Sequence, residues 1–161
     1  MAKPIPDGYH TVTPFIAVDG AADAIEYYKK AFGAEERLRM DGQDGSIAHA
    51  EIEIGDSLVM LSDPFPQSTV KSPNSLGGTS ASIFLYVEDV DSVVKQAVDA
   101  GAKIEMEPQD MFWGDRFGKL TDPFGHEWAI ATHIEDVSAE EMTRRSEAFF
   151  AEMAKQQPAH A

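Results

Sequence analysis

The residues that could do chemistry gather near the C-terminal end of the chain, between Phe112 and His133. This stretch holds both tryptophans, Trp113 and Trp128, together with Asp115, Arg116, His126 and His133. Aromatic faces beside a few polar groups are what a pocket for a small organic ligand requires. A guanidinium can bind a carboxylate or phosphate through two parallel hydrogen bonds, and an indole can stack on an aromatic or cationic ligand. The alternative is a structural hairpin in which Trp113 packs and Asp115 pairs with Arg116.

Two histidines are candidates for catalytic groups. His133 has the same strand parity as Ala129 and Ala131, which places it on the face where we expect the cleft. His49 stands beside Glu51 on a polar strand face and could act as a general base or a metal ligand, although a structural or surface role is open. The three histidines to which we assign no chemistry are His10 in the N-terminal lead, His126 after a turn, and His160 in the tail.

Composition limits the classes of partner. The chain has 161 residues with 43% hydrophobic and 25% charged content, as expected for a globular protein. It contains 28 Asp and Glu against 13 Lys and Arg, a net charge of −15 that would repel nucleic acid. No apolar run approaches the roughly 18 residues of a membrane span. Because cysteine is absent, thiolate chemistry and disulfides are excluded, and we expect a cytoplasmic protein.

The elements that must position these residues follow from periodicity. The first half predicts a strand over 12–18, a helix over 21–32 ended by Gly33, and strands over 35–40, 47–54 and 57–62. The segment 63–79, rich in Pro, Gly, Ser and Thr, is interpreted as a linker or surface loop.

The second half repeats the same order. A strand over 82–87, a helix over 90–100 and a strand over 103–107 precede the hairpin at 112–133, whose turn is Asp122-Pro-Phe-Gly125. Each half is therefore β-α-β-β-β. A last helix begins with the capping box Ser138-Ala-Glu-Glu141 and is expected to end before Pro158. Its Phe and Met stripe suits packing on the domain or on a second subunit better than contact with a membrane.

Together, these halves and the motifs Val12-Thr-Pro-Phe-Ile16, His49-Ala-Glu-Ile52, Phe112-Trp-Gly-Asp-Arg-Phe-Gly118 and Asp122-Pro-Phe-Gly-His-Glu-Trp128 resemble the vicinal oxygen chelate superfamily, in its PhnB-like branch. This superfamily includes glyoxalase I, extradiol dioxygenases and bleomycin-resistance proteins. The resemblance implies an α+β fold in which two modules form a cupped mixed sheet, with a C-terminal helix added. It covers 9–134 as a single domain, with module one at 9–63, a linker at 64–79 and module two at 80–134, and leaves 135–161 as helix and tail.

The resemblance also indicates where a metal would bind in metal-dependent members. The ligand positions, one from each of four strands, fall on Thr13, Met60, Ser82 and Ala129. None of these residues is a usual ligand, and their immediate neighbours cannot supply four ligands either. We therefore predict no metal site of the superfamily type and no cofactor. A displaced site built from His49, Glu51, Asp115 and His133 stays conceivable.

The function expected from this resemblance is metal-free binding of a small organic molecule. The side chains expected to line the cleft are Phe15, Met60, Phe84, Tyr86, Trp113, Asp115, Arg116 and Trp128. The alternative is a lyase, isomerase or dioxygenase that uses a displaced metal or a histidine base, and a purely structural role is a third possibility. Because the superfamily commonly pairs sheets across a dimer, a homodimer is the expected assembly. The identity of the ligand is left open.

Overall fold

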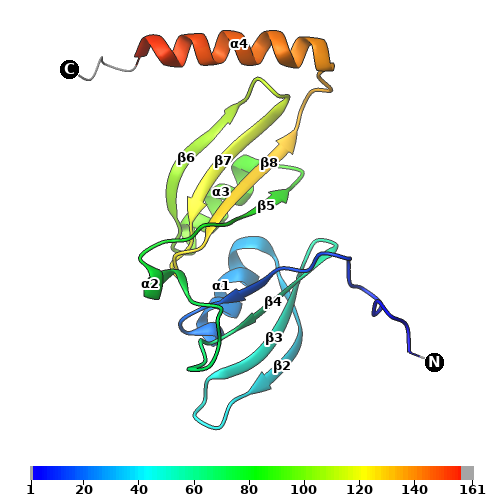
Figure 1. Cartoon of the computed structure of the whole chain (residues 1–161), viewed down its shortest axis with the longest axis vertical. Helices are drawn as coiled ribbons and strands as arrows, with labels where there is room; N and C mark the ends of the chain where they lie inside the picture. Colours follow the sequence, from blue (N-terminus) through cyan, green and yellow to red (C-terminus); the bar gives the residue numbers. More distant parts are fainter. Residues whose placement is uncertain (1, 157–161) are drawn as a thin grey trace.

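The computed structural model describes residues 2–156 and contains two four-stranded mixed sheets. The first half consists of β1 (Phe15–Ala17), α1 (Ala21–Phe32), β2 (Glu35–Asp41), β3 (Ile47–Ile54) and β4 (Ser57–Ser62). The second half consists of β5 (Ser82–Tyr86), α3 (Val90–Asp99), β6 (Lys103–Asp110), β7 (Asp115–Thr121) and β8 (Glu127–His133). We call these halves module one and module two. Their strand orders, β1-β4-β3-β2 and β5-β8-β7-β6, are equivalent, which confirms the predicted repeat (Figure 1).

The helices α1 and α3 each start beside the end of the last strand of their own module. The Asp63 carboxylate, which directly follows β4, accepts hydrogen bonds from the backbone N–H groups of Gly20 and Ala21 at 2.9 and 3.1 Å. In module two the Thr132 hydroxyl accepts the N–H of Val90 at 2.9 Å. These contacts satisfy N–H groups that a helix start leaves without intrahelical partners. The α1 boundaries agree with the sequence prediction, including the left-handed Gly33 that ends the helix.

The two modules share one hydrophobic core. The helices α1 and α3 contact each other, and the largest core cluster draws buried side chains from both modules. The rings of Phe32 and Trp128 lie 4.5 Å apart between centroids. The Asp122 carboxylate accepts hydrogen bonds from the Tyr28 hydroxyl and the Trp128 indole, each at 2.8 Å. The Asp-Pro-Phe-Gly turn thus joins module two to the first helix.

Several elements differ from the sequence prediction, and β6 runs to Asp110 rather than ending at residue 107. β1 begins at Phe15 rather than at residue 12, after Pro14, which has no N–H to donate to a sheet. The segment between the modules, predicted as a loop, contains the short helix α2 (Pro73–Leu76). The buried Ser72 hydroxyl caps α2 and donates a 2.6 Å hydrogen bond to Asp19.

The last helix, α4 (Ala139–Gln156), crosses the end of module two (Figure 1). Its start is capped as predicted, since the Glu141 N–H donates to the Ser138 hydroxyl at 3.2 Å. The Glu141 carboxylate instead pairs with Arg144 and Arg145, so the returning half of the capping box is not formed. Pro158 and His160 lie outside the described residues. Within residues 2–156, no helix is both long enough and apolar enough to cross a membrane.

Candidate functional site

The sheet of module two has an open face that points away from α1 and α3. Strand pairing aligns Tyr86 with Ala131 and Phe117, and aligns His133 with Asp115 across the same face. Phe84 pairs with Ala129 in the next row. The predicted parity of His133 with Ala129 and Ala131 is therefore confirmed. Phe84 and Tyr86 are 47% and 65% exposed, so this face presents aromatic surface outward.

The aromatic rings of this face form a continuous set. Ring centroids lie 5.0 Å apart for Phe84 and Tyr86, 5.7 Å for Phe84 and Phe117, and 5.6 Å for Phe117 and Trp113. The partly buried Met106 and Met111 pack against the same cluster. Such surfaces suit flat apolar ligands, since rings offer stacking faces and thioethers adapt to irregular shapes.

Asp115 is the polar centre of the face. The residue is only 3% exposed, and its carboxylate accepts three hydrogen bonds. The donors are the Tyr86 hydroxyl at 3.0 Å, the Trp113 indole at 3.0 Å and the His133 Nδ1 at 2.8 Å. We call these four residues the Asp115 cluster. The Asp115 carboxylate fixes the positions of Tyr86 in β5, Trp113 in the β6–β7 loop and His133 in β8. If one of these side chains moved away, a buried carboxylate oxygen would lose a hydrogen-bond donor, which is energetically costly.

The His133 imidazole lies between two carboxylates. Its Nε2 is 3.0 Å from Asp136 Oδ1, while its Nδ1 is held by Asp115. These two carboxylates, Asp136 first, raise the pKa of His133 above its usual value. The protonated ring can donate to both carboxylates at once, whereas a neutral ring has only one N–H. The geometry therefore favours the imidazolium form.

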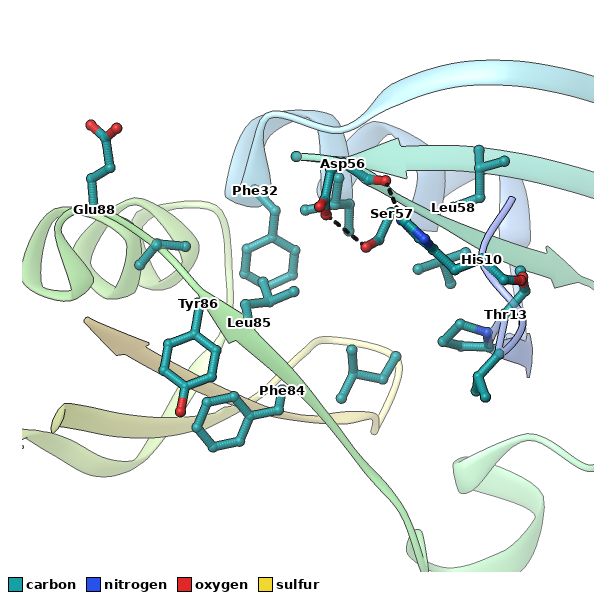
Figure 2. A pocket seen from close by; sticks show the side chains of 17 residues that line it. His10, Thr13, Phe32, Asp56, Ser57, Leu58, Phe84, Leu85, Tyr86 and Glu88 are labelled. Carbon is teal, nitrogen blue, oxygen red and sulfur yellow. Dashed lines mark hydrogen bonds between the residues drawn. The ribbon is translucent and has the colours of Figure 1, made fainter. Parts of the chain in front are cut away.

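A cavity of about 650 Å³ lies between the modules beside β5. Figure 2 shows Phe32, Phe84, Leu85 and Tyr86 along one side of it, with His10 and Thr13 of the N-terminal lead across from them. The His10 Nε2 is 3.0 Å from the backbone oxygen of Asp56 in the β3–β4 turn. Because Phe84 and Tyr86 belong to both features, the cavity opens next to the aromatic face.

Two residues expected to line the cleft lie elsewhere. Trp128 is fully buried in the shared core, because it alternates with Ala129 and therefore points toward the helices. Arg116 also points to the helix side, where its guanidinium forms hydrogen bonds of 2.6 and 2.7 Å with the carboxylate of Asp91 in α3. Its second partner is Asp110 at 3.0 Å. The alternative pairing of Arg116 with Asp115 is wrong as well, since the two alternate across β7.

The remaining predicted residues lie on the open face of module one. Phe15 and Met60 are paired neighbours there, and the Phe15 ring stacks on His49 with centroids 6.2 Å apart. His49 Nε2 lies 3.1 Å from Glu51 Oε1. Burial raises the pKa of Glu51, but hydrogen bonds from Tyr9 and His49 outweigh it and lower the pKa overall.

The side chains considered for a displaced metal site are divided between the two sheets. His49 and Glu51 lie on module one, whereas Asp115 and His133 lie on module two. Across residues 2–156, no three His, Asp or Glu side chains gather in an arrangement that could hold a metal ion. Within the described residues, these four side chains therefore do not come together in one site.

Three residues of the site were missed by reasoning from the sequence. His10 was set aside with the lead, although it lines the cavity. Phe117 could have been found, because its strand pairing with Ala131 follows from the predicted hairpin and its parity. Asp136 lies three residues beyond His133 in an irregular segment, where no periodic signal indicates direction.

The fold consists of two equivalent β-α-β-β-β modules, one of which has an open aromatic face. Comparison of the sequence with models of known families identifies the class of protein. Residues 9–130 match the model of the Glyoxalase/Bleomycin resistance protein/Dioxygenase superfamily, and the chain belongs to this superfamily.

The chain is also similar to proteins of known sequence and to a solved structure. An uncharacterized protein of Mycobacterium bovis is 42% identical over 134 residues, covering 81% of this chain and 88% of that protein. Protein YjdN of Escherichia coli is 32% identical over 145 residues, covering 74% and 92%. The crystal structure of TioX from Micromonospora sp. ML1 has a TM-score of 0.63 and 28% identity, covering 78% of this chain and 99% of TioX.

Proposed function

We propose that this protein binds a small, flat organic molecule against the open aromatic face of module two, without a metal ion. The observation that carries the proposal is the Asp115 cluster. A buried carboxylate fixes Tyr86 and Trp113 beside Phe84 and Phe117, so the stacking surface is arranged before any ligand arrives. A surface ordered in advance loses less conformational entropy on binding.

The metal-free part of the proposal rests on the chemistry of the chain's own residues. The four positions that supply ligands in metal-dependent members carry Thr13, Met60, Ser82 and Ala129. A hydroxyl, a thioether and a methyl group are poor ligands for the divalent ions that such enzymes use.

We further propose a cytoplasmic homodimer of the PhnB-like branch. The open faces of both modules carry exposed large apolar side chains, which are Phe15, Leu38, Met40, Phe84 and Tyr86. Such patches mark interaction surfaces, and pairing module one of one copy with module two of another would cover them. The branch rests on the Phe112–Gly118 and Asp122–Trp128 motifs. Sedimentation equilibrium of the full chain tests the assembly, and a monomer across the micromolar range would contradict it.

Titration with a neutral probe, N-phenyl-1-naphthylamine, tests the binding function. We expect saturable probe fluorescence and saturable quenching of Trp113, both unchanged by EDTA. Phe84→Ala should weaken binding by at least about tenfold, the range for removing a buried aromatic contact. Leu76→Ala, an exposed site on α2, serves as the matched control. Probe signals that never saturate, or one tightly bound metal per chain by elemental analysis, would overturn the proposal.

A histidine-dependent enzyme is the second candidate, since the 2.8 Å contact between Asp115 and His133 resembles the carboxylate–imidazole pairs of general base catalysis. The second carboxylate, Asp136, weakens this candidate, because an imidazole held between two acceptors keeps its proton. Proton–deuterium exchange at carbon, followed by NMR with a panel of small ketones, tests it. Exchange that is abolished in His133→Ala would favour the enzyme over the binding protein.

A further inference from the structure

The C-terminal helix α4 follows the region matched by the family and contacts the site through aromatic rings. The centroid of the Phe149 ring lies 5.1 Å from that of Phe112 in the β6–β7 loop. Phe112 in turn lies 5.1 Å from Trp113, nearly perpendicular to it. Since Trp113 donates its indole N–H to Asp115, this contact connects α4 to the centre of the Asp115 cluster.

A second connection runs through the segment that joins β8 to α4. Both Nη atoms of Arg145 in α4 form hydrogen bonds of 2.7 Å with the Glu135 carboxylate. The backbone N–H groups of Ile134 and Glu135 donate to the carbonyl of Gly114 at 2.9 and 3.0 Å. Gly114 stands between Trp113 and Asp115, so the position of α4 is transmitted to both neighbours.

The backbone at Gly114 requires glycine. Its φ of +96° is unfavourable for residues with a side chain, and a Cβ there would overlap the carbonyl oxygen of Glu135. The close approach of the connecting segment to the β6–β7 loop is therefore built into the sequence.

A third connection reaches the other side of the cluster. Asp136, in the same connecting segment, accepts the Nε2 of His133 at 3.0 Å while Asp115 holds Nδ1. The segment that Arg145 anchors therefore holds His133 from one side and Gly114 from the other.

From these three connections we propose that α4 is the positioning element of the ligand site. Phe149 and Arg145 hold Trp113 and His133 against Asp115, and without them the aromatic face loses its fixed edge. Both act through other residues and touch no ligand themselves. The consequence for ligand affinity rests on the function proposed above, but the effect on Trp113 does not.

The chain provides matched variants for the test. Phe149→Ala and Arg145→Ala each remove one connection. Met153→Ala removes an exposed apolar side chain from the same helix, and Arg144→Ala removes a guanidinium whose hydrogen bonds go to Glu141. All four are made in the full chain, and circular dichroism confirms that each is folded.

Acrylamide quenching of tryptophan fluorescence in the ligand-free protein is the first readout. Trp128 is fully buried in the core, so it contributes a protected background that Trp113→Phe measures directly. We expect Phe149→Ala and Arg145→Ala to increase quenching of Trp113 and to shift its emission to longer wavelength, while both controls match the wild type. Quenching of Trp113 that is unchanged in both test variants would overturn the proposal, whatever the probe does.

Binding of N-phenyl-1-naphthylamine is the second readout. The loss of one aromatic pair corresponds to about a two- to tenfold weaker Kd, which we expect for Phe149→Ala and not for Met153→Ala. If the wild type binds no probe while the Trp113 effects appear, the proposed function fails and the positioning role stands. If the probe binds equally to all variants while Trp113 moves, α4 does not position the ligand site and this inference fails.

Discussion

Replacing Asp122 by Asn should destabilise the whole fold, because its carboxylate connects the two modules inside the core. Asp122 is 4% exposed, and its carboxylate accepts four hydrogen bonds. Oδ1 accepts the backbone N–H groups of Phe124 and His126, each at 2.9 Å. Oδ2 accepts the Tyr28 hydroxyl and the Trp128 indole, each at 2.8 Å.

The magnitude follows from which donors an amide can still satisfy. If the oxygen of the substituted amide side chain takes the place of Oδ1, its NH₂ group faces Tyr28 and Trp128. The Tyr28 hydroxyl can rotate and accept, but the indole N–H of Trp128 can only donate. One buried donor is left without an acceptor, which costs about 1–3 kcal/mol. For a chain of this size the melting temperature should fall by about 2–12 °C.

Thermal unfolding followed by circular dichroism measures this change. Asp44→Asn, in the exposed β2–β3 turn of module one, is the control and should lower the melting temperature far less. Tyr28→Phe should cost less in the Asp122→Asn background than in the wild type, since the two side chains interact directly. A melting temperature for Asp122→Asn equal to that of the Asp44→Asn control would refute the reasoning.

Three further predictions concern the site and its surroundings. The pKa of His133, measured by NMR titration, should lie above the usual value of about 6.5 and fall in Asp136→Asn. Because the pKa of His133 is raised in the folded state, its contribution to stability should be fully present below about pH 6.5, the usual pKa of an unfolded histidine. This contribution should be lost as the pH rises through the folded pKa. A stability that does not change with pH over this range would contradict the prediction. Arg116→Ala should change the melting temperature little, since its partner Asp91 is exposed and the pair is screened by solvent, and should leave probe binding unchanged; a large loss of affinity would restore Arg116 to the ligand site. Gly114→Ala should lower the free energy of unfolding by about 1–3 kcal/mol and expose Trp113 to quencher, because the backbone at residue 114 is left-handed and an added Cβ has no room. A melting temperature equal to that of the wild type would contradict this close approach.

Much of the fold could be read from local patterns. The alternation of apolar and polar residues in β3 and the helical spacing of apolar residues in α1 depend only on which side chains are buried in the core. The boundaries of these two elements therefore agree with the prediction. The same alternation predicted that His133 shares a face with Ala129 and Ala131, and applied to Trp128 and Arg116 it would have placed both on the helix side. For these two residues strand parity carries the correct information, whereas their chemical character alone suggests a binding role.

Other features were decided only by the tertiary structure. The partners of Asp115 come from three separate segments, and the cavity forms where the N-terminal lead meets β5. No local pattern reports such meetings, because they depend on how the modules pack around their shared core. The sequence by itself determined the two modules, their superfamily and the face on which His133 lies. The tertiary structure alone decided that a buried carboxylate organises this face and that α4 reaches it, since hydrogen bonds between distant segments form only once packing has brought them together.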